Sequence, residues 1–316
     1  MSDKVILCKF RIELTLTRPN KLMKNKTAIS VLAFCIAILA LIASAAGIFT
    51  NQGSGLYEYQ SIRDQTISIY GKGLYKHMSA DVAIQGIAQD YITLFIAIPL
   101  LLFALLWARK GTYRSKFFLA GILNYLFLTY MFYMNMAMYN EMFLVYVALT
   151  GTTFFAFALT LLSIEIDKLP LIFNKTIPVK FIGGFLIFTA SSIATLWLGV
   201  IVPPLLDKTI IPVAVQHYTT LTVQGFDLSI FLPILFVSGL LLIKRHQFGY
   251  LMAAVTLVFL SLLMTALIAK IIAMSLVGVN VIPAVFIIPC IAIAAVVCAT
   301  ILLKNINEDS LNQKNI

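Results

Sequence analysis

The chain has 316 residues, of which 61% are hydrophobic and only 11% are charged. Because soluble domains carry roughly a quarter of charged residues, this composition excludes an ordinary water-soluble globular protein. The net charge of +10 does not call for a nucleic-acid partner, since loops that face anionic lipid at a membrane surface account for it. We therefore expect a protein that is embedded in lipid.

Eight apolar stretches are long enough to cross a bilayer core of roughly 30 Å as α-helices. In chain order they cover residues 28–49, 91–108, 117–138, 142–164, 181–202, 228–243, 248–273 and 281–303. Their apolar character is continuous, which favours helices over the alternating strands of a membrane barrel. The sequence thus predicts an all-α membrane protein, a bundle of about eight transmembrane helices.

The first predicted span leaves two alternatives open. "MKNKTAISVLAF" begins at Met23 with its own basic flank, so Met1 and Met23 are both candidate translation starts. "ASA" at residues 43–45 resembles a signal-peptidase site, and cleavage there would leave seven spans with an outside N-terminus. The apolar run is longer than a usual signal core, which favours an uncleaved anchor.

Lys and Arg residues are unevenly distributed between the two sides of the predicted bundle. With both termini in the cytoplasm, 18 of the 23 fall in the tails and inner loops. Four fall in the outer loops, namely Arg63, Lys72, Lys76 and Lys208, and Lys270 lies within the seventh span. Because positive charge concentrates on the cytoplasmic side, we expect a multi-pass protein of the cell membrane with both termini cytoplasmic.

The predicted spans group into two halves with one layout. Residues 28–164 form the first four-helix half, with an outer loop at 50–90, and residues 181–303 form the second. Residues 165–180 link the halves on the cytoplasmic side, while 1–27 and 304–316 are cytoplasmic tails. Four spans per half would give both halves the same orientation, as in parallel repeats.

Two sequence stretches carry the resemblance between the halves. "IQGIAQDYITLFIAIPLL" (84–101) and "VQGFDLSIFLPILF" (223–236) each contain Gln-Gly, then an acid, then a proline. Aligning the two acids requires an insertion, because the spacing from glycine to acid differs. A duplication is one interpretation, and chance similarity between apolar sequences is the other.

Two acids and a lysine lie near the predicted outer edge of the membrane. Asp90 precedes the second span, Asp227 precedes the sixth, and Lys270 approaches the same level along the seventh. Ionisable residues at such depth tend to pair and to face the bundle. We expect all three to line a shared outward-facing cavity, with the lysine neutralising one carboxylate. The alternative is that they snorkel to the interface or cap helix starts.

Each acid is accompanied by a glutamine and a proline. Gln89 and Gln224 are therefore further candidates for the cavity wall. Pro99 and Pro233 fall inside the apolar runs, where we expect them to kink their helices and to free backbone carbonyl groups.

The third predicted span is rich in tyrosine and methionine. Tyr125, Thr129, Tyr133 and Met136 fall near one helical face. Tyr125 and Tyr133 are thus candidates for the lining of a ligand cavity. The alternative interpretation places these tyrosines in the aromatic belt at the membrane–water interface.

The sequence indicates no enzyme and no cofactor. It contains no Walker loop, no Gly-x-Ser-x-Gly, no His-Glu-x-x-His and no dinucleotide-binding fingerprint. His77 and Asp81 have i, i+4 spacing, and His217 lies in the other outer loop. The three residues are therefore weak candidates for a three-ligand metal site. Chance explains this pattern better, and we predict no metal site.

The chain resembles a widespread family of uncharacterised bacterial integral membrane proteins over residues 73–146. This part reads "GLYKHMSADVAIQGIAQDYITLFIAIPLLLFALLWARKGTY" and then "LNYLFLTYMFYMNMAMYNEMFLVY", with "FDLSIFLPILF…GY" as a weaker second block. The family has no assigned activity. The resemblance therefore implies a location in the bacterial cytoplasmic membrane and supplies no catalytic residues.

Two functions follow as expectations. The first is a protein that binds or transports a small solute, an ion or a lipid through an outward-facing polar cavity. The alternative is a non-transporting membrane subunit or sensor that acts through its outer loops. The loop at 51–85, rich in Tyr, Ile, Ser and Gly, suits a small lid or hairpin. Membrane lipids are expected contacts, and the sequence identifies no protein partner.

Overall fold

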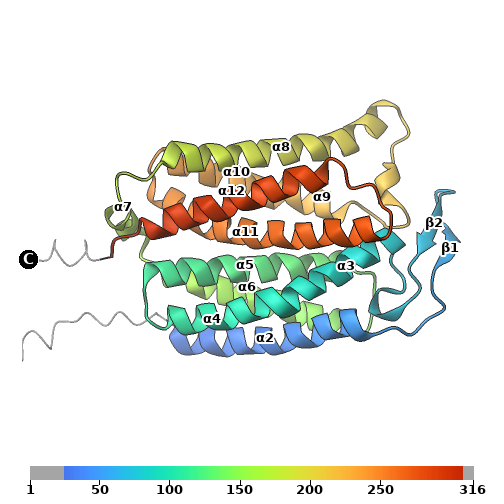
Figure 1. Ribbon diagram of the computed structural model, residues 1–316, viewed down its shortest axis with the longest axis horizontal. Helices are drawn as coiled ribbons and strands as arrows, with labels where there is room; N and C mark the ends of the chain where they lie inside the picture. Colours follow the sequence, from blue (N-terminus) through green and yellow to red (C-terminus); the bar gives the residue numbers. More distant parts are fainter. Residues whose placement is uncertain (1–24, 309–316) are drawn as a thin grey trace, which may run out of the picture.

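A computed structural model of the protein describes residues 25–308. Eight helices of this part of the chain are long and apolar enough to cross a membrane, which confirms the predicted all-α bundle. The first helix begins and the last helix ends at the same end of the bundle (Figure 1). The predictions for residues 1–24 and 309–316, including both candidate translation starts, lie outside the described residues.

The first four spans form a closed ring. α2 (Lys26–Phe49) packs on α3 (Ala80–Ile92), α4 (Ile98–Ala108) and α6 (Phe143–Leu162), while α5 (Tyr113–Met136) packs on α4 and α6. Small residues allow close packing of membrane helices. α2 buries a row of them at three- and four-residue spacing: Ala33, Ala37, Ala40, Ser44 and Gly47.

The last four spans form a ring that is open on one side. α8 (Val179–Leu206) packs on α10 (Leu232–Ile243), and α11 (Gln247–Leu276) packs on both α10 and α12 (Ala284–Lys304). α8 and α12 meet only marginally. α11 also packs on α5 and α3, and these contacts join the two halves along the centre of the bundle.

The connections at the two ends of the bundle differ in size. One end carries the antiparallel hairpin of β1 (Tyr57–Gln60) and β2 (Thr66–Ile69), so of the two expected forms of this loop, a lid or a hairpin, the structure contains the hairpin. We call this the hairpin end; the Lys and Arg distribution predicts that it faces outward. Short helices lie at both ends of the bundle (Figure 1). The hairpin end contains η1 (Gly73–Tyr75), η4 (Val213–Val215) and α9 (Thr222–Phe226). The opposite end contains η3 (Ile166–Lys168) and α7 (Leu169–Ile172).

The second and sixth spans are interrupted in the same way. A π-helical turn, η2 (Thr93–Ala97), separates α3 from α4, and another, η5 (Asp227–Phe231), separates α9 from α10. A proline follows as the second residue of the next α-helix, Pro99 in one span and Pro233 in the other. Because the proline ring collides with the carbonyl group four residues earlier, the wider π-helical turn provides the room that it needs.

A constant spacing relates these segments. The two prolines, the starts of η2 and η5 (93 and 227) and the starts of α5 and α11 (113 and 247) are each 134 positions apart. In this register Asp90 corresponds to Gln224, and Asp227 corresponds to Thr93. These segments therefore favour a register without a gap over the alignment of the two acids with an insertion.

Gly183 and Gly239 set the distance between α8 and α10. A Cβ atom on Gly183 would lie 2.6 Å from the carbonyl oxygen of Gly239. We expect Gly183→Ala to lower the free energy of unfolding by about 1–3 kcal/mol, because the backbones must separate. Thermal unfolding in detergent measures this loss. Gly184→Ala is the matched control, since a Cβ there meets no atom within 4 Å; an equal loss in both variants would contradict the close approach.

Candidate functional site

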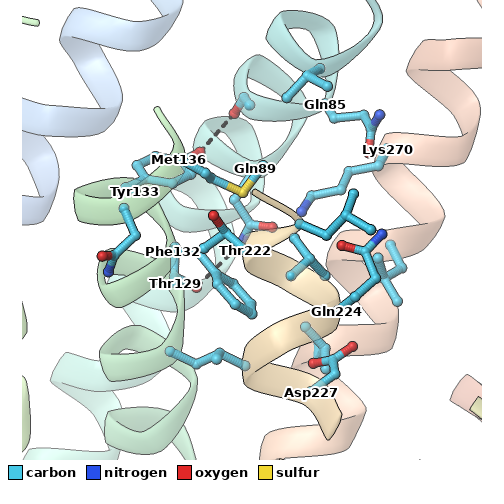
Figure 2. A pocket seen from close by; sticks show the side chains of 18 of the residues that line it. Gln85, Gln89, Thr129, Phe132, Tyr133, Met136, Thr222, Gln224, Asp227 and Lys270 are labelled. Carbon is cyan, nitrogen blue, oxygen red and sulfur yellow. Dashed lines mark hydrogen bonds between the residues drawn. The ribbon is translucent and has the colours of Figure 1, made fainter. Parts of the chain in front are cut away.

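A cavity of about 730 Å³ lies between the two halves at the hairpin end. α3 and α5 line it from the first half, and every span of the second half contributes to its wall. Most of the lining surface is apolar, and its polar side chains include Gln85, Gln89, Gln224, Asp227 and Lys270 (Figure 2). A mostly apolar cavity with few polar groups is typical of a small-molecule site.

Lys270 extends from α11 into this cavity (Figure 2). Its side chain is half-buried, and its amino group forms no hydrogen bond or ion pair with any residue in 25–308. It interacts electrostatically with Asp90 and Asp227, but neither carboxylate lies within the 4.0 Å of a direct ion pair. The predicted direct neutralisation of a carboxylate by Lys270 is therefore absent from the described structure.

Asp227 is the first residue of the π-helical turn η5 and lines the cavity. Its Oδ2 atom accepts a hydrogen bond of 2.8 Å from Nε1 of Trp197 on α8. Gln224 lies one helical turn earlier and lines the same cavity. Trp197 was missed by the sequence analysis, although tryptophan is rare in this chain, with only two residues.

Asp90 lies behind the cavity wall and does not line it. Its Oδ2 accepts a 2.5 Å hydrogen bond from the Tyr75 hydroxyl, and its Oδ1 accepts one of 3.1 Å from the Tyr133 hydroxyl. The predicted position at the mouth of a span is wrong, because the helix begins at Ala80 and Asp90 falls inside it. Asp90 is buried against Gly47 of α2 instead.

One of the two donors to Asp90, Tyr75, comes from the loop that precedes α3. Tyr75 belongs to η1 and is fully buried. Burial, and to a lesser extent the neighbouring Asp90, raises the pKa of the Tyr75 hydroxyl well above its usual value. The hydroxyl therefore stays protonated and donates. The Tyr133 hydroxyl also lies 2.9 Å from the carbonyl oxygen of Gly86, so its single proton is shared between this oxygen and Asp90, and its ring connects the cavity wall to the Asp90 cluster.

Gln89 and Tyr125 form a second polar contact between α3 and α5. The Nε2 atom of Gln89 donates to the Tyr125 hydroxyl at 2.5 Å and lies 3.4 Å from Oγ1 of Thr129. Gln89 lines the cavity, whereas Tyr125 is fully buried beyond it. An interfacial aromatic belt does not describe Tyr125, because the ring is enclosed by protein rather than exposed at the bundle surface.

The chain segment before α9 covers the cavity at the hairpin end. We call residues 214–221 the roof segment, because most of them line the cavity on this side. Arg63 from the hairpin loop donates to the carbonyl oxygens of Gln216 and Tyr218 at 3.3 and 3.0 Å. The Tyr218 hydroxyl in turn accepts from the backbone N–H of Ser79 at 3.1 Å. The two outer loops thus hold each other over the cavity.

The three candidate metal ligands, His77, Asp81 and His217, take part in the contacts between the two outer loops. His217 Nε2 lies 3.0 Å from the carbonyl oxygen of His77, and both carboxylate oxygens of Asp81 accept from the Gln216 amide. In the part of the chain that the structure describes, no cluster of three or more His, Cys, Asp or Glu residues is placed to hold a metal ion. The side chains of His217 and Asp81 and the backbone of His77 hold the roof segment to the start of α3.

Comparison with known proteins does not identify a family for this chain. No protein-family model, curated protein or solved structure matches the chain. The resemblance to a family of bacterial membrane proteins stays a prediction.

Proposed function

We propose that the protein binds a small solute or lipid in the cavity at the hairpin end and acts as its carrier in the membrane. The observation that carries this proposal is the Lys270 amino group, which lies in a cavity of about 730 Å³ without a direct partner among residues 25–308. Leaving a charge without a direct partner inside a membrane protein costs free energy, even when the side chain is only half-buried. A protein that keeps one in a cavity gains most from a ligand that pairs with it.

The interrupted helices support movement of the ligand rather than storage alone. α3 and η5 both line the cavity, and each belongs to a span that contains a π-helical turn before a proline. π-helical turns are frequent at functional sites, and related repeats are a feature of many transporters. The two spans therefore offer hinges beside the site.

The orientation of the proposed carrier follows from charge. The hairpin end carries few Lys and Arg residues, so we place it on the outer side of the bacterial cytoplasmic membrane and both chain termini in the cytoplasm. In this orientation the cavity and the roof segment face outward.

Thermal stability in detergent tests the proposal. A ligand that binds only the folded protein stabilises it by about 2.7 kcal/mol at a hundred times its dissociation constant. We expect a member of a panel of ions, lipids and small metabolites to raise the unfolding temperature of the wild-type protein. Lys270→Met should weaken this stabilisation; methionine is chosen because Met136 occupies the corresponding position of the first half, 134 residues earlier.

A charge-matched control distinguishes the loss of a lysine charge in the cavity from the loss of one at the protein surface. Lys72→Met removes the same charge from an exposed position between β2 and η1, and we expect it to leave the ligand effect unchanged. If every ligand stabilises the Lys270→Met and wild-type chains equally, the cavity is not the binding site. A ligand that passes this test is then offered to the protein in vesicles, where uptake distinguishes a carrier from a binding protein.

One observation favours the alternative of a sensor or subunit. All four residues of β1 are exposed, and its rings at Tyr57 and Tyr59 offer a surface to a partner at the hairpin end. In that case replacing the hairpin would abolish function, whereas Lys270→Met would not.

A further inference from the structure

We infer that the ligand of the cavity is an amphiphile, with an anionic head that meets Lys270 and an apolar chain that lies between α8 and α12. This inference rests on the proposed function and names the chemical class of its ligand. Three observations lead to it. They are the hydrogen-bond partners of the charged groups in the cavity, the apolar residues of its lining, and the open side of the second ring.

The charge of the head follows from the hydrogen bonds of the cavity. Asp227 accepts from Trp197 at 2.8 Å, and Asp81 accepts from the Gln216 amide at 3.2 and 3.4 Å. Both carboxylates of the lining thus have donors, whereas Lys270 has no acceptor within residues 25–308. A hydrogen bond with an ionised donor or acceptor is stronger than a neutral one, and Lys270 is the charged group of the lining that still lacks such a bond among the described residues. The group that the cavity lacks is therefore an anion.

The neighbourhood of Lys270 adds neutral hydrogen-bonding capacity. Gln224 lines the cavity, and its side-chain amide forms no hydrogen bond with the described residues. An amide offers two N–H donors and one acceptor. A carboxylate or phosphate head would find both a charge and a neutral donor in the cavity.

The apolar residues of the lining favour a ligand that also has an apolar part. Ile193 and Leu196 of α8, Ile288 of α12, and Leu263 and Leu267 of α11 all line the cavity. Its volume of about 730 Å³ falls within the roughly 300–1,000 Å³ of sites for drug-sized ligands. A bare inorganic ion would leave most of this apolar surface without contacts.

The outer parts of α8 and α12 leave a side of the cavity to lipid. No residue of α8 from Ser191 to Leu206 is buried, and none of α12 from Ala284 to Ile291. The inner parts of both helices do bury residues, and the two helices meet only marginally. In a membrane this side faces acyl chains, so an apolar chain can extend from the cavity into lipid.

Trp197 reports on this position. It lines the cavity on α8, and the only other tryptophan, Trp107, packs against Phe103 and Phe118 on the first half. In a Trp107→Phe chain, fluorescence comes from Trp197 alone. We expect 12-bromododecanoate, whose bromine quenches nearby tryptophan, to quench Trp197 saturably. Trp197→Phe, which keeps Trp107, should show only the unsaturable quenching of a detergent-dissolved probe.

Charge variants and head-group variants complete the experiment. In the Trp107→Phe background, Lys270→Met should raise the concentration for half-quenching at least tenfold, and Lys72→Met should leave it unchanged. 12-Bromododecanol and 12-bromododecyltrimethylammonium should bind at least tenfold more weakly than the carboxylate. Equal binding of either probe, or an unchanged Lys270→Met chain, overturns the anionic head.

Competitors distinguish a lipid-like ligand from a free anion. We expect acetate and inorganic phosphate to displace the brominated probe only at far higher concentrations, because they lack the chain. Displacement at equal concentration overturns the amphiphile. If no brominated probe binds but a water-soluble compound stabilises the protein through Lys270, this inference fails and the proposed function stands. If no compound of either kind binds, both fail.

Discussion

Replacing Gly47 by alanine is expected to lower the free energy of unfolding by about 3 kcal/mol or more. A Cβ atom at this position would lie 1.8 Å from Oδ2 of Asp90 and 2.9 Å from the Tyr75 hydroxyl. Both groups are buried, so neither can turn toward solvent to make room. The methyl group therefore overpacks the first ring and disrupts the 2.5 Å hydrogen bond between Tyr75 and Asp90.

The matched control is Gly151→Ala on α6. A Cβ there meets no atom within 4 Å, and alanine favours a helix over glycine by about 1 kcal/mol. We expect this variant to unfold at the same temperature as the wild-type protein or slightly above it. If Gly47→Ala also keeps the wild-type unfolding temperature, the Asp90 cluster does not stabilise the first ring.

The spans were predictable because they depend on local composition, but the beginning of the second span was not. The second helix begins at Ala80, well before the predicted residue 91. A prediction from hydropathy assumes that lipid surrounds every turn. Gln85, Gln89 and Asp90 belong to turns that face protein and the cavity, where hydrogen bonds replace lipid contacts. Hydropathy therefore assigns these polar residues to a loop, whereas the structure places them inside α3.

The candidate site was predictable only in part, for a different reason. Lys270 and Asp227 are charges in apolar runs, which the sequence displays directly. The partners of a buried group depend on tertiary packing: Asp90 meets Gly47, Tyr75 and Tyr133, which come from a helix, a loop and a third span. No local pattern pairs these residues. The roof segment was missed likewise, because its contacts join two distant loops.

The second large effect concerns the bond between Tyr75 and Asp90. We expect Tyr75→Phe to lower the free energy of unfolding by about 1.5–3 kcal/mol, because the buried carboxyl group loses a donor. In an Asp90→Leu background the same change should have the opposite sign. Leucine keeps the branched shape but accepts nothing, so the Tyr75 hydroxyl is buried without its acceptor and phenylalanine removes that penalty. Thermal unfolding of the four chains gives the coupling energy.

This sign reversal separates the hydrogen bond from ring packing. Tyr75 and Tyr133 also contact each other edge to face, with centroids 6.3 Å apart, and phenylalanine preserves that contact. If packing alone stabilised the cluster, Tyr75→Phe would have the same small effect in both backgrounds. A coupling energy near zero would therefore contradict the hydrogen bond. A coupling energy of about 2 kcal/mol or more would identify Asp90 as the acceptor that fixes η1 to the first ring.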